Sequence, residues 1–444
     1  MVRSRRPGVD CNRLPQAWIA LAVTAFLVSV CYALLLVLAR SGMVTLFGDN
    51  ERGFHSALVL HVNFSLLVWF LSMGGFFWSR NRQWASRRIN CVAFAAALAG
   101  VLLIAVAPLV GAVTPIMSDY LPVLDQVFFL AGIGLFALAV SVVSLPSLVH
   151  LPQALASRAD SASLLCGAAA LVLLLADVQL GIAASSALPD TALLRYQRLF
   201  WGAGHLLQTV NLLLVMQAWL WLLGRSQVIG WPARLFRIQV PLILFPALIS
   251  PLFPYLPAPY DMRLFTWQME WNGLLVMPSL LGLLLARSST GAGSALLFFL
   301  RLPIWLLLLG FILGWLIEEN NAWVPAHYHG VIGAITLSYM GVCYHHLGIL
   351  GNTRVAQRLL AWQSGLYGGG ILLVMAGLIV SDIPRKNLVA VGDLPPLGRL
   401  LMATGGGGAL IASLLFVVLM AQHRLCGAGS HNKLADLARG AGDV

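Results

Sequence analysis

Two histidines separated by a single residue, His327 and His329, are the side chains of this sequence best suited to chemistry. They lie in the stretch Trp323-Val324-Pro325-Ala326-His327-Tyr328-His329-Gly330, near the start of a long apolar segment. Each residue turns an α-helix by about 100°, so positions i and i+2 point about 200° apart. The two imidazoles therefore cannot bind one small metal ion, but they can serve two sites on opposite sides of a helix. Hydration of both rings among lipid headgroups is the alternative interpretation.

Two further histidines lie at the same depth in other apolar segments. His61 and His205 fall within about eight residues of the outer ends of their segments, as His327 and His329 do. At about 1.5 Å per residue, all four lie in the outer third of a bilayer. Neutral imidazole is a common ligand of haem iron and of metal ions. The four histidines therefore predict a layer of haem or metal, whereas His345-His346 lies at the inner end of its segment and is better explained as interfacial.

The composition indicates that these histidines are held by membrane-spanning helices. Of the 444 residues, 59% are hydrophobic and only 10% are charged, whereas soluble proteins carry about 25% charged residues. The net charge of +11 does not predict nucleic-acid binding, because the arginines are dispersed between apolar segments and suit the surface of the lipid bilayer. The six cysteines form no CxxCH motif, so covalent haem attachment is not expected.

The hydrophobic pattern predicts an all-α, polytopic integral membrane protein with 12 transmembrane helices. We expect a cytoplasmic arm at 1–14, a membrane domain at 15–422 and a cytoplasmic tail at 423–444. The expected spans are 15–40, 54–78, 89–115, 121–148, 161–186, 197–224, 234–256, 260–286, 293–317, 325–349, 359–381 and 400–422.

The distribution of Lys and Arg predicts the orientation of the chain. The segments that lie inside when the N-terminus is cytoplasmic carry most of these residues, as the positive-inside rule requires. We therefore expect a multi-pass protein of the bacterial cytoplasmic (inner) membrane with both termini in the cytoplasm. Asp125 and Asp177 fall within expected spans, where they serve either a proton path or hydrogen bonds between helices.

Four stretches of the sequence resemble subunit I of the haem-copper oxidase superfamily, which includes cytochrome c oxidases and nitric oxide reductases. The resemblance covers nearly the whole chain. The His-x-Asn form of the first stretch looks closer to the nitric oxide reductases. The stretches are Leu60-His61-Val62-Asn63-Phe64, Trp201-Gly202-Ala203-Gly204-His205, Ala326-His327-Tyr328-His329 and Pro384-Arg385-Lys386.

This resemblance implies two haems and a role for each matching residue. His61 and His329 would bind a low-spin haem from its two axial sides, and His327 would bind a high-spin haem. His205 would hold a distal metal, either non-haem iron or copper. Arg385 and Lys386 would bind haem propionates.

The sequence departs from the family pattern at the distal metal. The family's paired histidines would fall near Ile249-Ser250-Pro251-Leu252, where this chain has none. Thr209 stands where many oxidases carry the tyrosine four residues after the histidine. Glu270 lies at nearly the depth of His205, and carboxylate with imidazole suits iron. We expect Glu270 either to ligate or protonate at the distal site or to form a structural hydrogen bond with Asn272 or Gln208.

The resemblance implies a respiratory oxidoreductase that passes electrons from the low-spin haem to a high-spin haem and metal centre, which reduces O2 or NO. The electron donor would be a cytochrome c-type or small copper protein, and a second redox or accessory subunit is expected. One alternative is a non-catalytic, haem-carrying electron-transfer subunit with a degenerate distal site. A 12-span secondary transporter is the other alternative.

Overall fold

The computed structural model describes residues 13–40, 50–80, 87–111, 113–157, 161–223, 231–285, 294–317, 323–348, 354–382 and 394–440. The predicted propionate-binding residues Arg385 and Lys386 lie outside these ranges. The α-helices are α1 (Leu14–Arg40), α2 (Asn50–Val62), α3 (Trp69–Ser79), α4 (Arg87–Val106), α5 (Val127–Val149), α6 (Leu151–Ala156), α7 (Ser161–Ser185), α8 (Ala192–Leu222), α9 (Trp231–Ile249), α10 (Tyr260–Leu285), α11 (Ser294–Trp315), α12 (Trp323–His346), α13 (Arg354–Ser381) and α14 (Pro396–Gly440).

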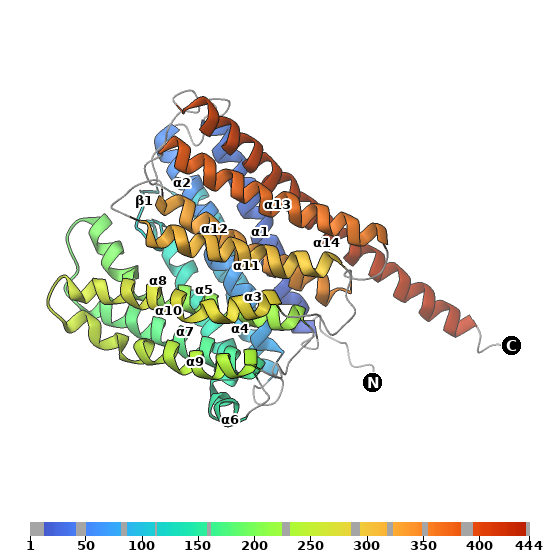
Figure 1. The fold of residues 1–444 in the computed structure, drawn as a ribbon, viewed down its shortest axis with the longest axis horizontal. Helices are drawn as coiled ribbons and strands as arrows, with labels where there is room; N and C mark the ends of the chain where they lie inside the picture. The colour runs from blue at the N-terminus through green and yellow to red at the C-terminus, as the bar shows by residue number, and fades with distance from the viewer. Residues whose placement is uncertain are drawn as a thin grey trace.

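The fold is a bundle of long apolar helices, as the composition predicts (Figure 1). Ten helical segments of the described residues are long and apolar enough to cross a membrane, and a helix satisfies its own backbone hydrogen bonds there. The helices α10 and α12, of 26 and 24 residues, are not among the ten, although they are as long as those that are. The chain is thus consistent with a multi-pass membrane protein, and the count of 12 spans stays a prediction.

Two neighbouring predicted spans have bounds that differ from the structure. The span predicted at 89–115 ends early, because α4 ends at Val106 and Pro115 lies in a strand. Residues 121–126 were expected to open the fourth helix, but the structure places a short antiparallel pair there, in which β1 (Pro115–Ile116) faces β2 (Val123–Leu124). The helix α5 begins only at Val127. Gln126 caps its N-terminus, where the Gln126 side chain accepts a hydrogen bond from the Phe129 N–H at 3.1 Å. Pro122 interrupts the apolar run that suggested a helix. We call residues 113–126 the outer hairpin.

The two aspartates predicted within spans have defined partners. Asp125 lies in the outer hairpin, not in a helix, and its carboxylate accepts a hydrogen bond from the Tyr196 hydroxyl at 2.7 Å. Asp177 of α7 accepts one from Ser141 of α5 at 2.6 Å. A hydrogen bond between helices, one of the two interpretations of Asp177, is therefore present.

Glycine residues allow the backbones of α13 and α14 to approach each other closely. A Cβ atom added to Gly405 would lie 2.5 Å from the backbone oxygen of Gly370, and one added to Gly370 would lie 2.5 Å from that of Gly405. Side chains at either position would separate α13 from α14, which run side by side in Figure 1.

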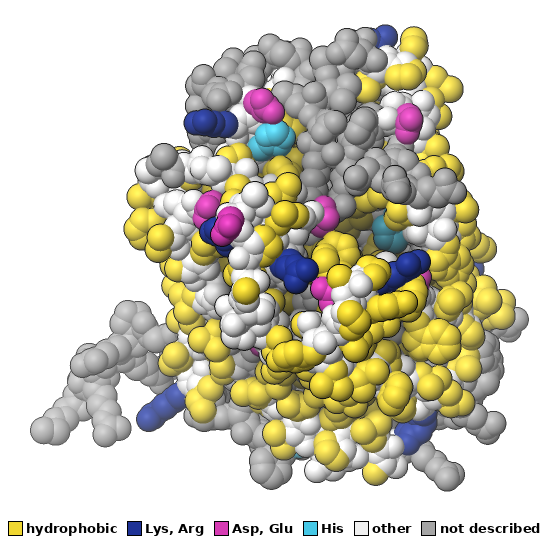
Figure 2. Space-filling model, turned by 90° about the vertical axis from the view of Figure 1, so that its left-hand side faces the viewer, with side chains coloured by type: hydrophobic (Ala, Val, Ile, Leu, Met, Phe, Trp, Pro, Cys, Tyr) yellow, Lys and Arg dark blue, Asp and Glu magenta, His cyan; other side chains and the backbone are white. Residues whose placement is uncertain are grey.

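Several helices that carry the predicted site residues begin at one end of the bundle. The first turns of α8, α10 and α12 lie towards the left of Figure 1. Figure 2 looks onto this end, where histidine, acidic and basic side chains reach the surface between hydrophobic ones. This end of the molecule therefore carries ionisable side chains of both signs.

Candidate functional site

His61 lies in the last turn of α2, directly before a change of helix type. Residues Asn63–Val68 form a π-helix, η2, and α3 continues from Trp69. Such wide turns inside helices often occur at functional sites. Asn63 is fully buried, and its amide donates to the backbone oxygens of Val59 at 2.9 Å and of Pro122 at 2.7 Å. The Asn of the His-x-Asn motif therefore ties α2 to the outer hairpin.

We predict that Asn63→Ala lowers the free energy of unfolding by about 1–3 kcal/mol, because it removes the buried donor to two carbonyl oxygens. Denaturant titration of the purified protein in detergent measures this change. Ser65→Ala is the matched control, since the Ser65 hydroxyl bonds only within its own helix, to Val62 at 3.2 Å. Equal stability of the two variants would contradict the structural role of Asn63.

The imidazole of His61 is oriented by α1. Its Nδ1 lies 2.9 Å from the backbone oxygen of Ser29 and 3.1 Å from the Ser29 hydroxyl. A carbonyl oxygen only accepts hydrogen bonds, so Nδ1 carries the hydrogen. The other ring nitrogen, Nε2, therefore keeps its lone pair and is the one able to bind a metal.

The two histidines of α12 are oriented in the same way by different partners. Nδ1 of His327 donates to the backbone oxygen of Gly310 on α11 at 2.7 Å. Nδ1 of His329 donates to the backbone oxygen of Pro325, in its own helix, at 2.6 Å. The spacing of the two histidines predicted different surroundings for the two rings, and these contacts confirm that.

His205 of α8 completes the set, because its Nδ1 donates to the backbone oxygen of Trp201 at 2.8 Å. All four histidines predicted to bind haem or metal thus use Nδ1 for a backbone carbonyl, which leaves the lone pair on Nε2. Metal-ligating histidines commonly donate their other nitrogen to such a partner. His345, at the inner end of α12, differs, since its buried Nδ1 has no hydrogen-bond partner in the described part of the chain.

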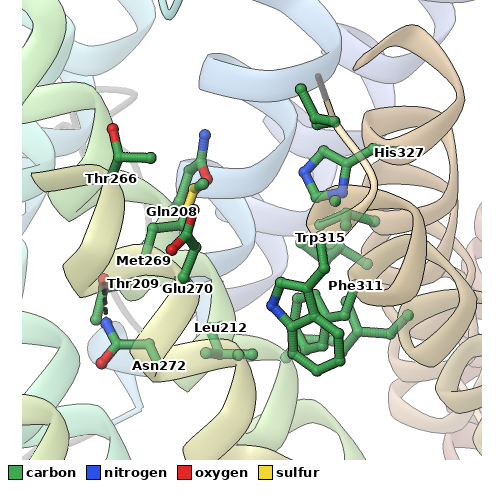
Figure 3. Close-up of a pocket in the computed structure, with 17 residues that line it drawn as sticks. Gln208, Thr209, Leu212, Thr266, Met269, Glu270, Asn272, Phe311, Trp315 and His327 are labelled. Atoms are coloured by element: carbon green, nitrogen blue, oxygen red, sulfur yellow. Dashed lines mark hydrogen bonds between the residues drawn. The ribbon is translucent and has the colours of Figure 1, made fainter. Parts of the chain in front are cut away.

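A cavity of about 240 Å³ lies between α8, α10, α11 and α12. His327 projects from one wall, and Gln208, Thr209, Glu270 and Asn272 line the other (Figure 3). Phe311 and Trp315 are among the apolar residues that line the wall beside His327. The cavity combines one histidine with apolar walls and a few polar groups, which is typical of ligand-binding sites.

Glu270 and Asn272 are not paired with each other. The amide of Asn272 donates to the Thr209 hydroxyl at 2.9 Å, and its buried Oδ1 has no partner in the described residues. Within the same residues, no hydrogen bond or ion pair is found for the Glu270 carboxylate, and its side chain is exposed. The structural hydrogen bond to Asn272 or Gln208, one of the two interpretations of Glu270, is therefore not observed.

Tyr120 of the outer hairpin is the contact that sequence reasoning missed. Its hydroxyl lies 2.5 Å from Nε2 of His205, a residue only 1% exposed. The Thr266 hydroxyl lies 3.4 Å from the same nitrogen and also lines the cavity, whereas His205 lies outside the lining. Nothing in the local sequence of the hairpin indicated this partner, which is 85 residues away along the chain.

The residues around His205 do not fit a distal metal ion. Protein-bound metals such as zinc take three or four protein ligands, and the described residues contain no group of three or more His, Cys, Asp and Glu side chains able to hold one. Glu270 lines the cavity opposite His327, while Nε2 of His205 bonds to Tyr120. The distal metal held by His205 and Glu270 stays a prediction from the sequence.

Comparison with known proteins supports the fold inferred from the motifs. The chain is similar to a haem-copper terminal oxidase solved as a dimer by cryo-electron microscopy, with a TM-score of 0.67, 15% identity, and coverage of 92% of this chain and 84% of that one. Two curated relatives are uncharacterised. A protein of Aquifex aeolicus is 29% identical over 75% of this chain and 84% of its own, and RP382 of Rickettsia prowazekii is 25% identical over 92% and 95%. No family model matches the chain.

Proposed function

We propose that this chain is the haem-binding catalytic subunit of a respiratory membrane oxidoreductase that reduces O2 or NO. The observation that carries the proposal is the shared orientation of His61, His327 and His329, each with Nδ1 held by a backbone oxygen, so that the lone pair lies on Nε2. The fold similarity to a haem-copper terminal oxidase supports it.

In this proposal the histidines divide between two haems. His61 and His329 would hold the low-spin haem, and His327, which lines the cavity, would hold the high-spin haem. Bound haem supplies electron transfer and a position for a diatomic gas. Both reductions consume protons, and Glu270, on the wall opposite His327, would transfer protons into the cavity. The apolar residues Phe311 and Trp315 would contact the macrocycle.

The reduced optical spectrum of the purified protein, recorded with CO and with NO alongside metal content, tests the proposal. We expect a low-spin haem and a CO-binding high-spin haem, together with consumption of NO or O2 when an electron donor is supplied. Absence of haem would refute the proposal and would favour a transporter. Two haems without consumption of either gas would favour a non-catalytic, haem-carrying subunit, the alternative suggested by the missing histidine pair.

We further propose that electrons arrive from a cytochrome c-type or small copper protein at the outer face of the bacterial inner membrane. The ionisable side chains at the end of the bundle shown in Figure 2 support a polar docking face there. A second redox or accessory subunit would complete the complex. Co-purification from native membranes tests this part of the proposal.

Gly314→Ala is predicted to displace the high-spin haem while sparing the low-spin one. A Cβ atom at Gly314 would lie 2.7 Å from Nδ1 of His327, so the ring must move and lose its bond to Gly310. The CO difference spectrum measures the loss. Gly273→Ala is the matched control, because Gly273 lines the same cavity and its added Cβ would meet only Phe311, at 3.8 Å. Equal CO binding in both variants would refute this packing argument.

A further inference from the structure

The hydrogen bond between Tyr120 and His205 occupies the ring nitrogen that a metal ion on α8 would need. Nδ1 of His205 is committed to the Trp201 oxygen, so Nε2 has a single lone pair to offer. The Tyr120 hydroxyl donates to that lone pair at 2.5 Å. A metal ion would need the same lone pair, at about 2.0–2.1 Å from the nitrogen. It would then overlap the phenol oxygen, so ion and phenol exclude each other at this position.

The ring of Tyr120 is fixed in position because it packs against α8 at a glycine, Gly204. A Cβ atom at Gly204 would lie 2.5 Å from Cβ and 2.6 Å from Cγ of Tyr120, so only glycine leaves the space that the ring fills. The ring lies over the imidazole of His205, with centroids 4.2 Å apart, and meets Trp201 edge-on at 5.3 Å.

The backbone on both sides of Tyr120 is also held in place. The Ser118 hydroxyl donates to the Leu121 oxygen at 2.5 Å, which closes the turn around Tyr120. Gln197 of α8 donates to the Asp119 carboxylate at 2.9 Å, and Asn63 of η2 donates to the Pro122 oxygen at 2.7 Å. Two helices therefore fix the outer hairpin in the position that aims the phenol at His205.

We propose that Tyr120 is the partner of His205 in the working protein, and that this hydrogen-bonded pair takes the place of a distal metal ion. Tyr120 is then a positioning residue that holds the neutral imidazole with Nε2 as acceptor. Thr266, which touches Nε2 and lines the cavity, connects the pair to the site of His327. The inference rests on contacts within the chain and does not depend on haem, so it can fail or hold independently of the proposed function.

Nitrogen NMR of the purified full-length protein tests the pair. Histidine is labelled with 15N, the sample is reduced and saturated with CO, and the His205 signals are assigned by their loss in His205→Asn. We expect an Nε2 signal of an imine nitrogen that accepts a hydrogen bond. Tyr120→Phe should move it downfield, to the position of an imine nitrogen without a donor.

Tyr196→Phe is the matched control, since it removes another hydroxyl between α8 and the outer hairpin, the donor to Asp125, without touching Nε2. We expect its His205 signals to match those of the wild type. An Nε2 signal that is the same in Tyr120→Phe as in the wild type would overturn the proposal.

Metal content of the wild-type protein provides a second readout that needs no Tyr120 variant to fold. We expect no non-haem iron, copper or zinc in stoichiometric amount. A stoichiometric non-haem metal that disappears in His205→Asn would overturn the proposal and would restore the distal metal predicted from the sequence. Because haem is counted separately by its pyridine spectrum, loss of haem and gain of a third metal are distinguishable results.

Discussion

The His327→Ala protein is expected to lose its high-spin haem, and with it all CO binding, while the low-spin haem stays. His327 is the one histidine in the lining of the cavity, and its Nε2 is the ring nitrogen left free by the bond to Gly310. Without that nitrogen, haem in the cavity would have no histidine ligand from its lining. The CO difference spectrum of the reduced protein and the haem-to-protein ratio measure the loss.

His345→Ala is the control for this experiment, because it removes a histidine from the inner end of the same helix. We expect its spectra to equal those of the wild type, since Nδ1 of His345 has no hydrogen-bond partner within the described residues. Full CO binding in His327→Ala would show that another side chain ligates the high-spin haem.

The reverse result is expected for His61→Ala, which should abolish the low-spin spectrum and leave CO binding intact. His61 and His329 present Nε2 from α2 and α12, and a low-spin haem needs both axial nitrogens. His329→Ala should therefore give the same spectrum as His61→Ala. Electron delivery to the cavity should fail in both variants, so steady-state turnover is expected to fall to background. The reduced-minus-oxidised spectrum and the rate of gas consumption measure the two effects.

Ser29→Ala is the control for His61→Ala, because it changes a contact of the imidazole and keeps the imidazole itself. It removes the hydroxyl 3.1 Å from Nδ1 of His61 but keeps the backbone oxygen at 2.9 Å. We expect it to retain the low-spin haem. A low-spin spectrum that survives in His61→Ala, or is lost only in His329→Ala, would rule out the axial pair.

The helices could be predicted from the sequence because segments that cross a membrane are long and uniformly apolar. Their approximate lengths and their order therefore follow from the hydrophobic pattern. The depth of the histidines follows from counting within those spans. The alternation of His327 and His329 gave their separate surroundings from helix geometry alone. The oxidase-like fold inferred from the motifs is confirmed by the structural similarity, while the ligand roles stay predictions.

The outer hairpin could not be predicted in the same way. Its strands are two residues each, too short for the alternation that marks a strand, and Leu121, Val123 and Leu124 look like the start of an apolar helix. Tyr120 gains its role only from a contact across the fold, and the carbonyl partners of the histidines are backbone atoms that no side-chain pattern encodes. The π-helix after His61 likewise has no residue signature.

The outer hairpin has a consequence for how disturbances spread through the molecule. Asn63, two residues from His61, binds this segment at the Pro122 oxygen, and His205 of α8 binds it at the Tyr120 hydroxyl. Loosening one attachment is expected to weaken the other, so we expect the surroundings of the two histidines to be thermodynamically linked although they belong to different helices. We expect the region around His61 on α2 and the region around His205 on α8 to become disordered together when the outer hairpin is disturbed.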